Sequence, residues 1–282
     1  MAVAKAKSNN QRFWRDAALP FVEAQRVRDG RGVCYEKHSH DTFSIGAITG
    51  GASTCWNRGH SHDVQTGSVV VINPEDVHAC NPVDGVLWSY QMIYVDTVWL
   101  RDLQVEIGAD VAGDFAMFGD IIANDPAIYR DLTGLGHALF DRDRDALGKE
   151  TAMVSFFTGL QGRLDRRGGR SDVGAGDNRK MRRAASYIRA HCADAVTLAD
   201  ICSAAGVSPS YLVRAFKQAF GMTPHAFLIN CKIQRARHAL KRGERIVDVA
   251  FDCGFADQAH FQRVFKRLMA VTPRQYALAQ AA

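Results

Sequence analysis

The chain has 282 residues, of which 47% are hydrophobic and 23% charged, which favours two globular domains over a disordered or disulfide-stapled chain. No run of about 18 apolar residues occurs, and no apolar segment follows the basic start, so we expect a cytoplasmic protein without a membrane partner. The formal net charge of +5 is small only because the two halves of the chain carry opposite charges.

Short strands are predicted over residues 20–100, after a polar, basic segment of residues 1–19 that we interpret as a mobile tail. The segments FSIGAITGG, GSVVVIN and VLWSYQMIYV are apolar or alternating runs, interrupted by Gly, Asn, Pro and Asp. This spacing of short strands and turns is typical of a β-sandwich or a small β-barrel.

Amphipathic helices are predicted over residues 101–164, because apolar residues recur there at helical spacing, as in AIYRDLTGLGHALF. Their apolar stripes can pack on the β domain or against a second subunit, so we expect this segment to form a homodimer. Residues 165–178 are rich in Gly, Asp and Arg, which is typical of a linker. With a helical segment at residues 179–282, the predicted fold class is an α+β multidomain chain.

Histidines are locally dense in the predicted β domain. In YEKHSHDTF, Glu36, His38 and His40 lie two residues apart, so in a strand the three side chains would share one face. His78 follows in NPEDVHACNP, and a second HSH at residues 60–62 fits the surface of a hairpin. The first group could form a metal site, line a polar small-molecule pocket, or consist of structural histidines.

Seven cysteines are scattered along the chain: Cys34, Cys55, Cys80, Cys192, Cys202, Cys231 and Cys253. Their number is odd and no CxxC pair occurs, which indicates neither a disulfide framework nor a zinc ribbon. We expect most of them to be small buried apolar residues.

The C-terminal segment contains an internal repeat. Residues 198–227 align with residues 246–276 at an offset of 48 as far as Gly206 and Gly254, and of 49 beyond them. Each copy predicts a short helix, a turn whose glycine permits a positive φ, and a second helix. This is the outline of a helix-turn-helix.

The positive charge of the chain is concentrated around this repeat. Residues 178–282 contain 17 Lys and Arg against 6 Asp and Glu, a net charge of +11, whereas residues 1–177 contain 18 against 24. One half therefore attracts polyanions and the other repels them. The positive charge could belong to an ordinary solvated surface, but such an imbalance between the two halves favours binding of nucleic acid by the C-terminal half.

The solvent-facing side of each predicted second helix carries groups that can read DNA. Glutamine pairs with adenine and arginine with guanine, whereas lysine suits a phosphate. In the second copy these residues are Gln258, Ala259, Gln262, Arg263 and Lys266. In the first copy they are Ser210, Val213, Arg214 and Lys217, with Val213 able to contact a thymine methyl. Ser210, taken alone, fits an ordinary solvent-exposed helix face. Arg214 and Arg263, however, occupy equivalent positions in the two copies of the repeat, which favours contact with double-stranded DNA.

This segment resembles the DNA-binding domain of the AraC/XylS family of transcriptional regulators. The stretch VAFDCGFADQAHFQRVFKRLMAVTPRQY is similar to the family signature over its whole length. The resemblance implies two helix-turn-helix units, joined by the helix PHAFLINCKIQRARHALKRG, that enter successive major grooves. Ala270 departs from the glycine that is usual before the closing Thr-Pro, which leaves the turn at that position open.

The N-terminal segment resembles the cupin-like sensor domain that many such regulators carry. The HSH of His38 and His40 fits the first cupin motif, and GSVVVINPEDVH fits the second. A metal-binding cupin has a glutamate four or five residues after its HxH pair, where this chain has Ser44 and Ile45. Only Glu36 could replace that carboxylate on the same face, because Asp41 points to the other.

We therefore expect no metal and no cofactor, but a pocket for a small-molecule effector. Its predicted lining is Glu36, His38, His40 and His78. A protonatable cluster of this kind is suited to a polar or anionic metabolite, through hydrogen bonds and charge.

These features predict a one-component, sequence-specific transcriptional regulator that is not an enzyme. The effector would change how the β domain meets its partner subunit or its own DNA-binding half, and so shift the population competent for DNA or RNA polymerase. Two alternatives stay open: a metal-dependent cupin enzyme fused to a DNA-binding domain, and a constitutive architectural DNA binder. The missing glutamate disfavours the first, and the well-formed N-terminal segment the second.

Overall fold

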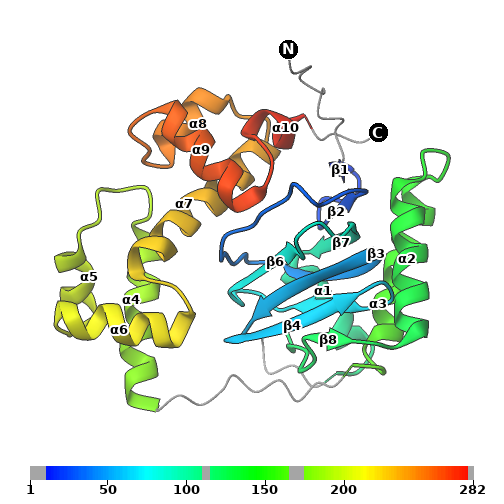
Figure 1. Cartoon of the computed structure of the whole chain (residues 1–282), viewed down its shortest axis with the longest axis horizontal. Helices are drawn as coiled ribbons and strands as arrows, with labels where there is room; N and C mark the ends of the chain where they lie inside the picture. The colour runs from blue at the N-terminus through cyan, green and yellow to red at the C-terminus, as the bar shows by residue number, and fades with distance from the viewer. Residues whose placement is uncertain (1–10, 110–114, 165–174, 279–282) are drawn as a thin grey trace.

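The computed structural model describes residues 11–109, 115–164 and 175–278, with the side chains of residues 175–178 excepted. Within these ranges an antiparallel β domain is followed by three helices that cover it and then by seven helices of a C-terminal domain (Figure 1). The predicted α+β class, with an all-α C-terminal domain, is confirmed. None of the described helices combines the length and apolarity needed to cross a membrane.

The β domain is built around one long, shared strand. The strands are β1 (Gln11–Trp14), β2 (Val22–Val27), β3 (Phe43–Asn57), β4 (His60–Gln65), β5 (Val69–Ile72), β6 (His78–Pro82), β7 (Trp88–Val95) and β8 (Ile122–Ala123). The first half of β3 pairs with β5 and β7, and its second half pairs with β4 and β6. A register shift between Ile48 and Gly50 separates the two halves, so β3 belongs to two sheets that enclose an interior.

Helices α1 (Thr97–Glu106), α2 (Pro126–Phe140) and α3 (Ala146–Leu160) cover the β domain. Each begins after an aspartate, Asp96, Asp125 or Asp145, whose carboxylate accepts backbone N–H bonds of the first turn. The apolar stripes of α2 and α3 pack with the inner residues of β3 and β7 in one core. The apolar stripes were expected to pack on the β domain or against a second subunit. The structure shows that they pack on the β domain.

Residues 11–19 differ from the predicted mobile tail. The strand β1 pairs with β2 along its whole length, and Trp14 is buried in the core. The segment is polar overall, but Trp14 and Leu19 are both 1% exposed and Arg15 donates to the buried Glu23. Residues 1–10 lie outside the described part of the chain. So do residues 165–174 of the predicted linker, and a helix begins at Ala175.

Two of the seven cysteines pair, although the sequence indicated no disulfide framework. Cys55 and Cys80 form a disulfide between β3 and β6. The register of these strands places the two residues directly opposite each other, and such long-range pairing leaves no local spacing signal in the sequence. The prediction of buried, apolar cysteines holds for Cys192, Cys202 and Cys253.

The C-terminal domain consists of two helix-turn-helix units joined by one long helix, as predicted. Its helices are α4 (Ala175–Ala190), α5 (Leu198–Ala205), α6 (Pro209–Phe220), α7 (Pro224–Lys241), α8 (Ile246–Asp252), α9 (Gln258–Met269) and α10 (Pro273–Ala277). Figure 1 shows α7 running from the group of α4, α5 and α6 to the group of α8, α9 and α10. Each group has its own apolar core.

The turns between paired helices have the predicted geometry. Gly206 has φ 66° and Gly254 has φ 71°, and a side chain at Gly254 would also collide with the carbonyl of Ala193. Ala270 ends α9 with φ 56°, so the turn keeps the left-handed conformation although the usual glycine is absent. The departure from the family pattern at this position therefore leaves the local fold intact.

Candidate nucleic-acid interface and effector pocket

The helices α6 and α9 each expose one polar stripe and bury the opposite face. Their inner residues, Leu212 and Phe216 in α6 and Phe261 and Phe265 in α9, are 0% exposed. Nearly all of the predicted DNA-contacting residues are exposed: Ser210, Val213, Arg214, Lys217, Ala259, Gln262, Arg263 and Lys266, whereas Gln258 is half-buried. The structure therefore brings the two predicted stripes to the surface.

The cations of these stripes are not neutralised within the described part of the chain. None of the ion pairs found there involves Arg214, Lys217, Arg263 or Lys266. Their charges are therefore available to phosphates and base edges.

A pocket lies inside the β domain. Its apolar wall comes from β3, β5 and β7, with Ile48, Ile72 and Met92 among its lining residues. Its other wall is formed by β6 and by residues 35–41, called the 35–41 segment below. The volume open to water-sized molecules is about 40 Å³, which is room for a few waters only.

Three of the four predicted effector-binding residues meet in this pocket. The ring centroids of His38 and His78 are 4.4 Å apart, those of His40 and His78 are 4.8 Å apart, and those of His38 and His40 are 6.3 Å apart. Each Nδ1 faces a backbone carbonyl at 2.7–3.0 Å, which assigns the proton to Nδ1. The Nε2 atoms are therefore hydrogen-bond acceptors, and that of His40 lies 3.4 Å from the hydroxyl of Ser44.

Burial keeps these imidazoles neutral. Desolvation lowers the pKa of His38 to about 4 and that of His78 to about 3, and the nearby charge of Arg237 acts in the same direction. The pKa of His40 also lies well below its usual range, because of burial and of the adjacent His78. The cluster therefore offers hydrogen-bond acceptors at neutral pH, and the expected recognition by histidine charge is not supported.

A metal is poorly matched to this cluster. Neutral imidazoles can bind metals, but among the described residues no group of three or more His, Cys, Asp or Glu side chains has a geometry that could hold an ion. The positions of the usual cupin glutamate hold Ser44 and Ile45. The residues present therefore do not fit the metal of a metal-binding cupin.

The fourth predicted residue, Glu36, lies outside the pocket. Its side chain is exposed and forms an ion pair with Arg267 of α9, with Oε2 and Nε 3.0 Å apart. The prediction failed because the 35–41 segment is not a strand. Its β-type pairing with the sheet is limited to an isolated bridge between His38 and His78, so the alternation of faces does not extend back to Glu36.

Three tyrosines complete the polar end of the pocket and were not predicted. The hydroxyls of Tyr35 and Tyr90 lie 2.7 Å apart, and Tyr94 donates to Oε1 of Gln25. The sequence signal was present in WSYQMIYV, where Tyr90, Met92 and Tyr94 alternate and therefore share one strand face. The second HSH does not line the pocket: His60 is exposed and His62 is half-buried on β4, as predicted for a surface hairpin.

We expect the β domain to lose stability as the pH falls from about 6.5. A buried histidine with a lowered pKa stays neutral in the fold but takes up a proton when unfolded, so acid favours unfolding. For His38 the full loss is about 3 kcal/mol, reached near pH 4. All four tryptophans lie within residues 14–99, so the tryptophan fluorescence of a thermal scan reports on this part of the chain.

The matched comparison is between His38→Gln and His60→Gln. His38→Gln should flatten the dependence of the fluorescence midpoint on pH between about 6.5 and 4. The exposed His60 should leave it unchanged. Equal pH profiles for the wild type and His38→Gln would contradict the burial of a neutral imidazole.

The other side of the 35–41 segment contacts the C-terminal domain. Asn230 of α7 donates to the carbonyl of Ser39 and accepts its N–H, at 3.1 Å and 3.2 Å. His238 of α7 lies 3.0 Å from the carboxylate of Asp41. Together with the Glu36 contact to α9, these bonds tie the pocket wall to α7 and α9 of the C-terminal domain.

A buried carboxylate forms a second tie between the domains. Glu23 of β2 is 2% exposed and lies 2.8 Å from Nζ of Lys241, 2.7 Å from Nε of Arg15 and 3.7 Å from Nη2 of Arg237. The hydroxyl of Tyr276 in α10 donates to it at 3.2 Å. Burial alone would raise the pKa of Glu23, but Lys241, Arg15 and Arg237 outweigh it and hold the pKa well below the usual range.

Arg237 connects this carboxylate to the pocket. The arginine is 4% exposed, and its guanidinium lies 5.6 Å from the ring centroid of Tyr94, which lines the pocket. One side chain of α7 therefore touches both the buried tie and the pocket wall.

Comparison with known families decides the identity of these two domains. Residues 201–279 match the model of a helix-turn-helix domain, and residues 22–157 match the model of the AraC-like ligand binding domain. The chain belongs to the AraC/XylS family of transcriptional regulators. It is therefore a sequence-specific DNA-binding regulator with a small-molecule effector domain.

Relatives of this AraC/XylS regulator align with most of its length. It is 28% identical over 239 residues to the uncharacterized HTH-type transcriptional regulator YbfI of Bacillus subtilis, covering 85% of each chain. It is 23% identical over 248 residues to the HTH-type transcriptional activator RhaS of Salmonella arizonae, covering 86% of this chain and 87% of RhaS.

Solved structures of ToxT from Vibrio cholerae have the same fold. Unsaturated fatty acid-bound ToxT superposes with a TM-score of 0.58 at 17% identity, over 96% of this chain and 94% of that one. An apo ToxT variant gives a TM-score of 0.58 at 15% identity, over 96% of both chains.

Proposed function

We propose that α6 and α9 are the DNA-recognition helices of this regulator. The observation that carries the proposal is the pair of exposed polar stripes, at equivalent repeat positions, above fully buried inner faces. In this proposal Gln258, Ala259, Gln262, Arg263 and Lys266 contact one part of the operator. Ser210, Val213, Arg214 and Lys217 contact the other part, with fewer base-specific donors.

Substitutions within one stripe should separate base readout from phosphate contact. Arg263→Ala should weaken binding to the preferred site by about 1–3 kcal/mol and relax the sequence preference at one position. Lys266→Ala should weaken binding to all sequences about equally. Fluorescence anisotropy with the preferred duplex and single-base variants measures both effects.

Arg31→Ala is the control for loss of one positive charge, because Arg31 is exposed in the β domain and bonds only its neighbour Asp29 among the described pairs. It should leave DNA affinity unchanged. If Lys266→Ala altered the preferred sequence and Arg263→Ala did not, the proposed roles within α9 would be wrong.

The proposed effector is a small molecule with hydroxyl or N–H donors at one end and an apolar body. Support comes from the neutral Nε2 acceptors of His38, His40 and His78, and from the apolar wall opposite. A metabolite pocket usually encloses about 300–1,000 Å³, whereas the open volume here is about 40 Å³. An effector of ordinary size must therefore widen the pocket.

The 35–41 segment is the wall that we expect to yield. The other walls are paired strands, whereas this segment pairs with the sheet through one isolated bridge and is also held by the side chain of Asn81. Outward movement would disturb its contacts with Asn230, His238 and Arg267, and so change the arrangement of α7 and α9. Effector binding would thereby shift the population competent for DNA.

The remaining parts of the proposal concern partners and location. We propose a homodimer that uses the helical segment of residues 101–164, contact with RNA polymerase, a cytoplasmic location and no catalytic activity. The relatives, which are transcriptional regulators, support the last two points. Sedimentation of the full-length chain tests the dimer.

A further inference from the structure

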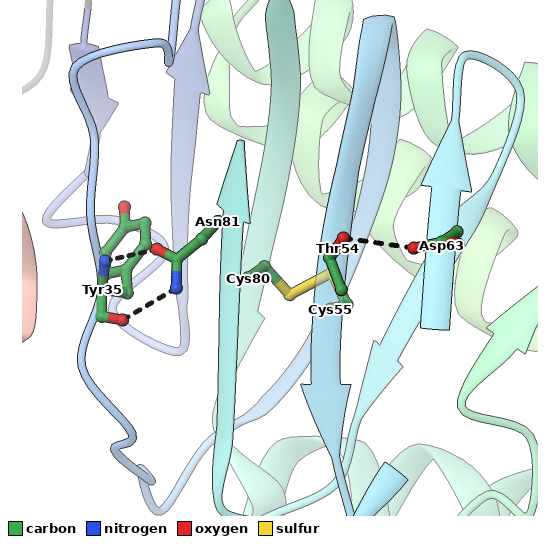
Figure 2. Close-up of a disulfide and its surroundings, with 6 residues drawn as sticks. All are labelled: Tyr35, Thr54, Cys55, Asp63, Cys80 and Asn81. Atoms are coloured by element: carbon green, nitrogen blue, oxygen red, sulfur yellow. Dashed lines mark hydrogen bonds between the residues drawn. A yellow bond between two sulfur atoms is a disulfide. The ribbon is translucent and has the colours of Figure 1, made fainter. Parts of the chain in front are cut away.

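The disulfide between Cys55 and Cys80 lies in the wall of the effector pocket. Figure 2 shows it bridging neighbouring strands, and the two residues are register partners in β3 and β6 with Cα atoms 4.0 Å apart. Both residues line the pocket. Cys55 is 1% exposed, whereas Cys80 is half-buried, so Cys80 is the more accessible of the two.

The compartment in which a DNA-binding regulator works makes this bond unusual. Thiols are kept reduced where DNA is transcribed, and disulfides found there are mostly transient and catalytic or redox-sensing. Two thiols of the C-terminal domain are shielded from this chemistry: desolvation raises the pKa of the buried Cys253 to about 11 and that of the half-buried Cys231 to about 12. Those thiols are held protonated and are poor nucleophiles.

The residues beside Cys80 hold the 35–41 segment. His78, two positions before it, exchanges two backbone hydrogen bonds with His38, at 2.9 Å and 3.1 Å. Asn81, one position after it, accepts from the N–H of Tyr35 at 2.7 Å and donates to the Tyr35 carbonyl at 3.1 Å (Figure 2). A bond that fixes β6 to β3 therefore fixes the pocket wall that contacts α7 and α9.

We propose that Cys55 and Cys80 form a reversible redox site, which gives this regulator a second input besides its effector. The oxidised form holds the 35–41 segment against β6, and the reduced form loosens it. The proposal does not depend on which effector binds, because it rests on the bond and on the contacts of β6 with the 35–41 segment.

The oxidant is a peroxide, and the step balances. The Cys80 sulfur attacks one oxygen of hydrogen peroxide, the O–O bond breaks, and a sulfenic acid and one water form. The Cys55 sulfur then attacks the Cys80 sulfur, the S–S bond forms, and a second water leaves. Two thiols thus give two electrons and two protons to one peroxide. A dithiol reductant of the thioredoxin class reverses the step through a mixed disulfide.

The test uses the full-length chain with Cys34→Ser, which removes the exposed thiol. One sample is treated with hydrogen peroxide, and the other with thioredoxin, its reductase and NADPH. Maleimide labelling with peptide mass mapping, performed after each sample is unfolded, should modify Cys55 and Cys80 in the reduced sample and neither in the oxidised one. Hydrogen exchange of the 35–41 segment should be about tenfold faster in the reduced sample.

Cys80→Ser provides the matched variant, since it cannot form the bond. Hydrogen exchange of this variant should match that of the reduced sample under both treatments. If the variant does not fold, the comparison between the oxidised and reduced samples of the chain that keeps both Cys55 and Cys80 is the test. Three results would overturn the proposal: a bond that thioredoxin cannot reduce in the folded chain, thiols that stay free after peroxide, or equal exchange of the 35–41 segment in both samples.

Discussion

Glu23→Gln should lower the temperature at which the helices of the C-terminal domain unfold. The substitution leaves Arg15, Arg237 and Lys241 together at a buried site without their carboxylate. Removing one partner of a buried ion pair usually costs about 3–5 kcal/mol, because the remaining charge stays uncompensated. At neutral pH the full effect applies, since a carboxylate with a depressed pKa contributes stability until the pH falls through that depressed value.

The measurement is the midpoint of helix unfolding, followed by far-UV circular dichroism of the full-length chain. A loss of this size should lower the midpoint by at least about 10 °C for a domain of this length. Glu36→Gln is the matched control, because Glu36 also pairs across the domains but its side chain is 52% exposed. Such surface pairs contribute about 0–1 kcal/mol. Equal midpoints for the two variants would refute the role of the buried tie.

Replacing His38 and His40 together by Ala should abolish the response to the effector. Each substitution removes one buried acceptor, and two lost hydrogen bonds weaken effector binding by on the order of 100-fold. An effector is first found by thermal shift against a metabolite library, and the response is then followed in a reporter strain. DNA binding without effector should persist, because both residues lie outside α6 and α9.

His60→Ala with His62→Ala is the control for this pair, since it changes the other HSH on the surface of β4. It should respond like the wild type. Two results would count against the pocket assignment. One is a normal effector response of the double variant at His38 and His40. The other is a transition metal that is bound stoichiometrically by the wild type and absent from this variant.

Local sequence patterns were sufficient for the DNA-binding domain. The repeat placed α5, α6, α8 and α9, and the turn glycines Gly206 and Gly254 have the positive φ that the motif requires. Apolar spacing within a helix determines which face is buried, so the exposure of Arg214 and Arg263 followed directly. A short-range rule thus predicted both stripes.

The β domain was predicted less completely because its contacts are long-range. The alternation rule placed His38 and His40 together, but it misplaced Glu36, because the segment before His38 is not a strand. The pairing of Cys55 with Cys80 depends on the register of β3 and β6, which no local pattern reveals. The tie between Glu23 and α7 joins distant parts of the chain and likewise had no sequence signal.

Selection of bound duplexes from a random pool by the full-length chain tests the central claim most directly. The 18-residue helix α7, about 27 Å long, separates the two units, so the enriched motif should have two parts whose centres lie about one helical turn, or about 10 base pairs, apart. Arg263→Ala should erase a preference in one part and Arg214→Ala in the other. Failure to enrich any sequence, or a motif that neither substitution changes, would contradict the assignment of α6 and α9 as paired recognition helices.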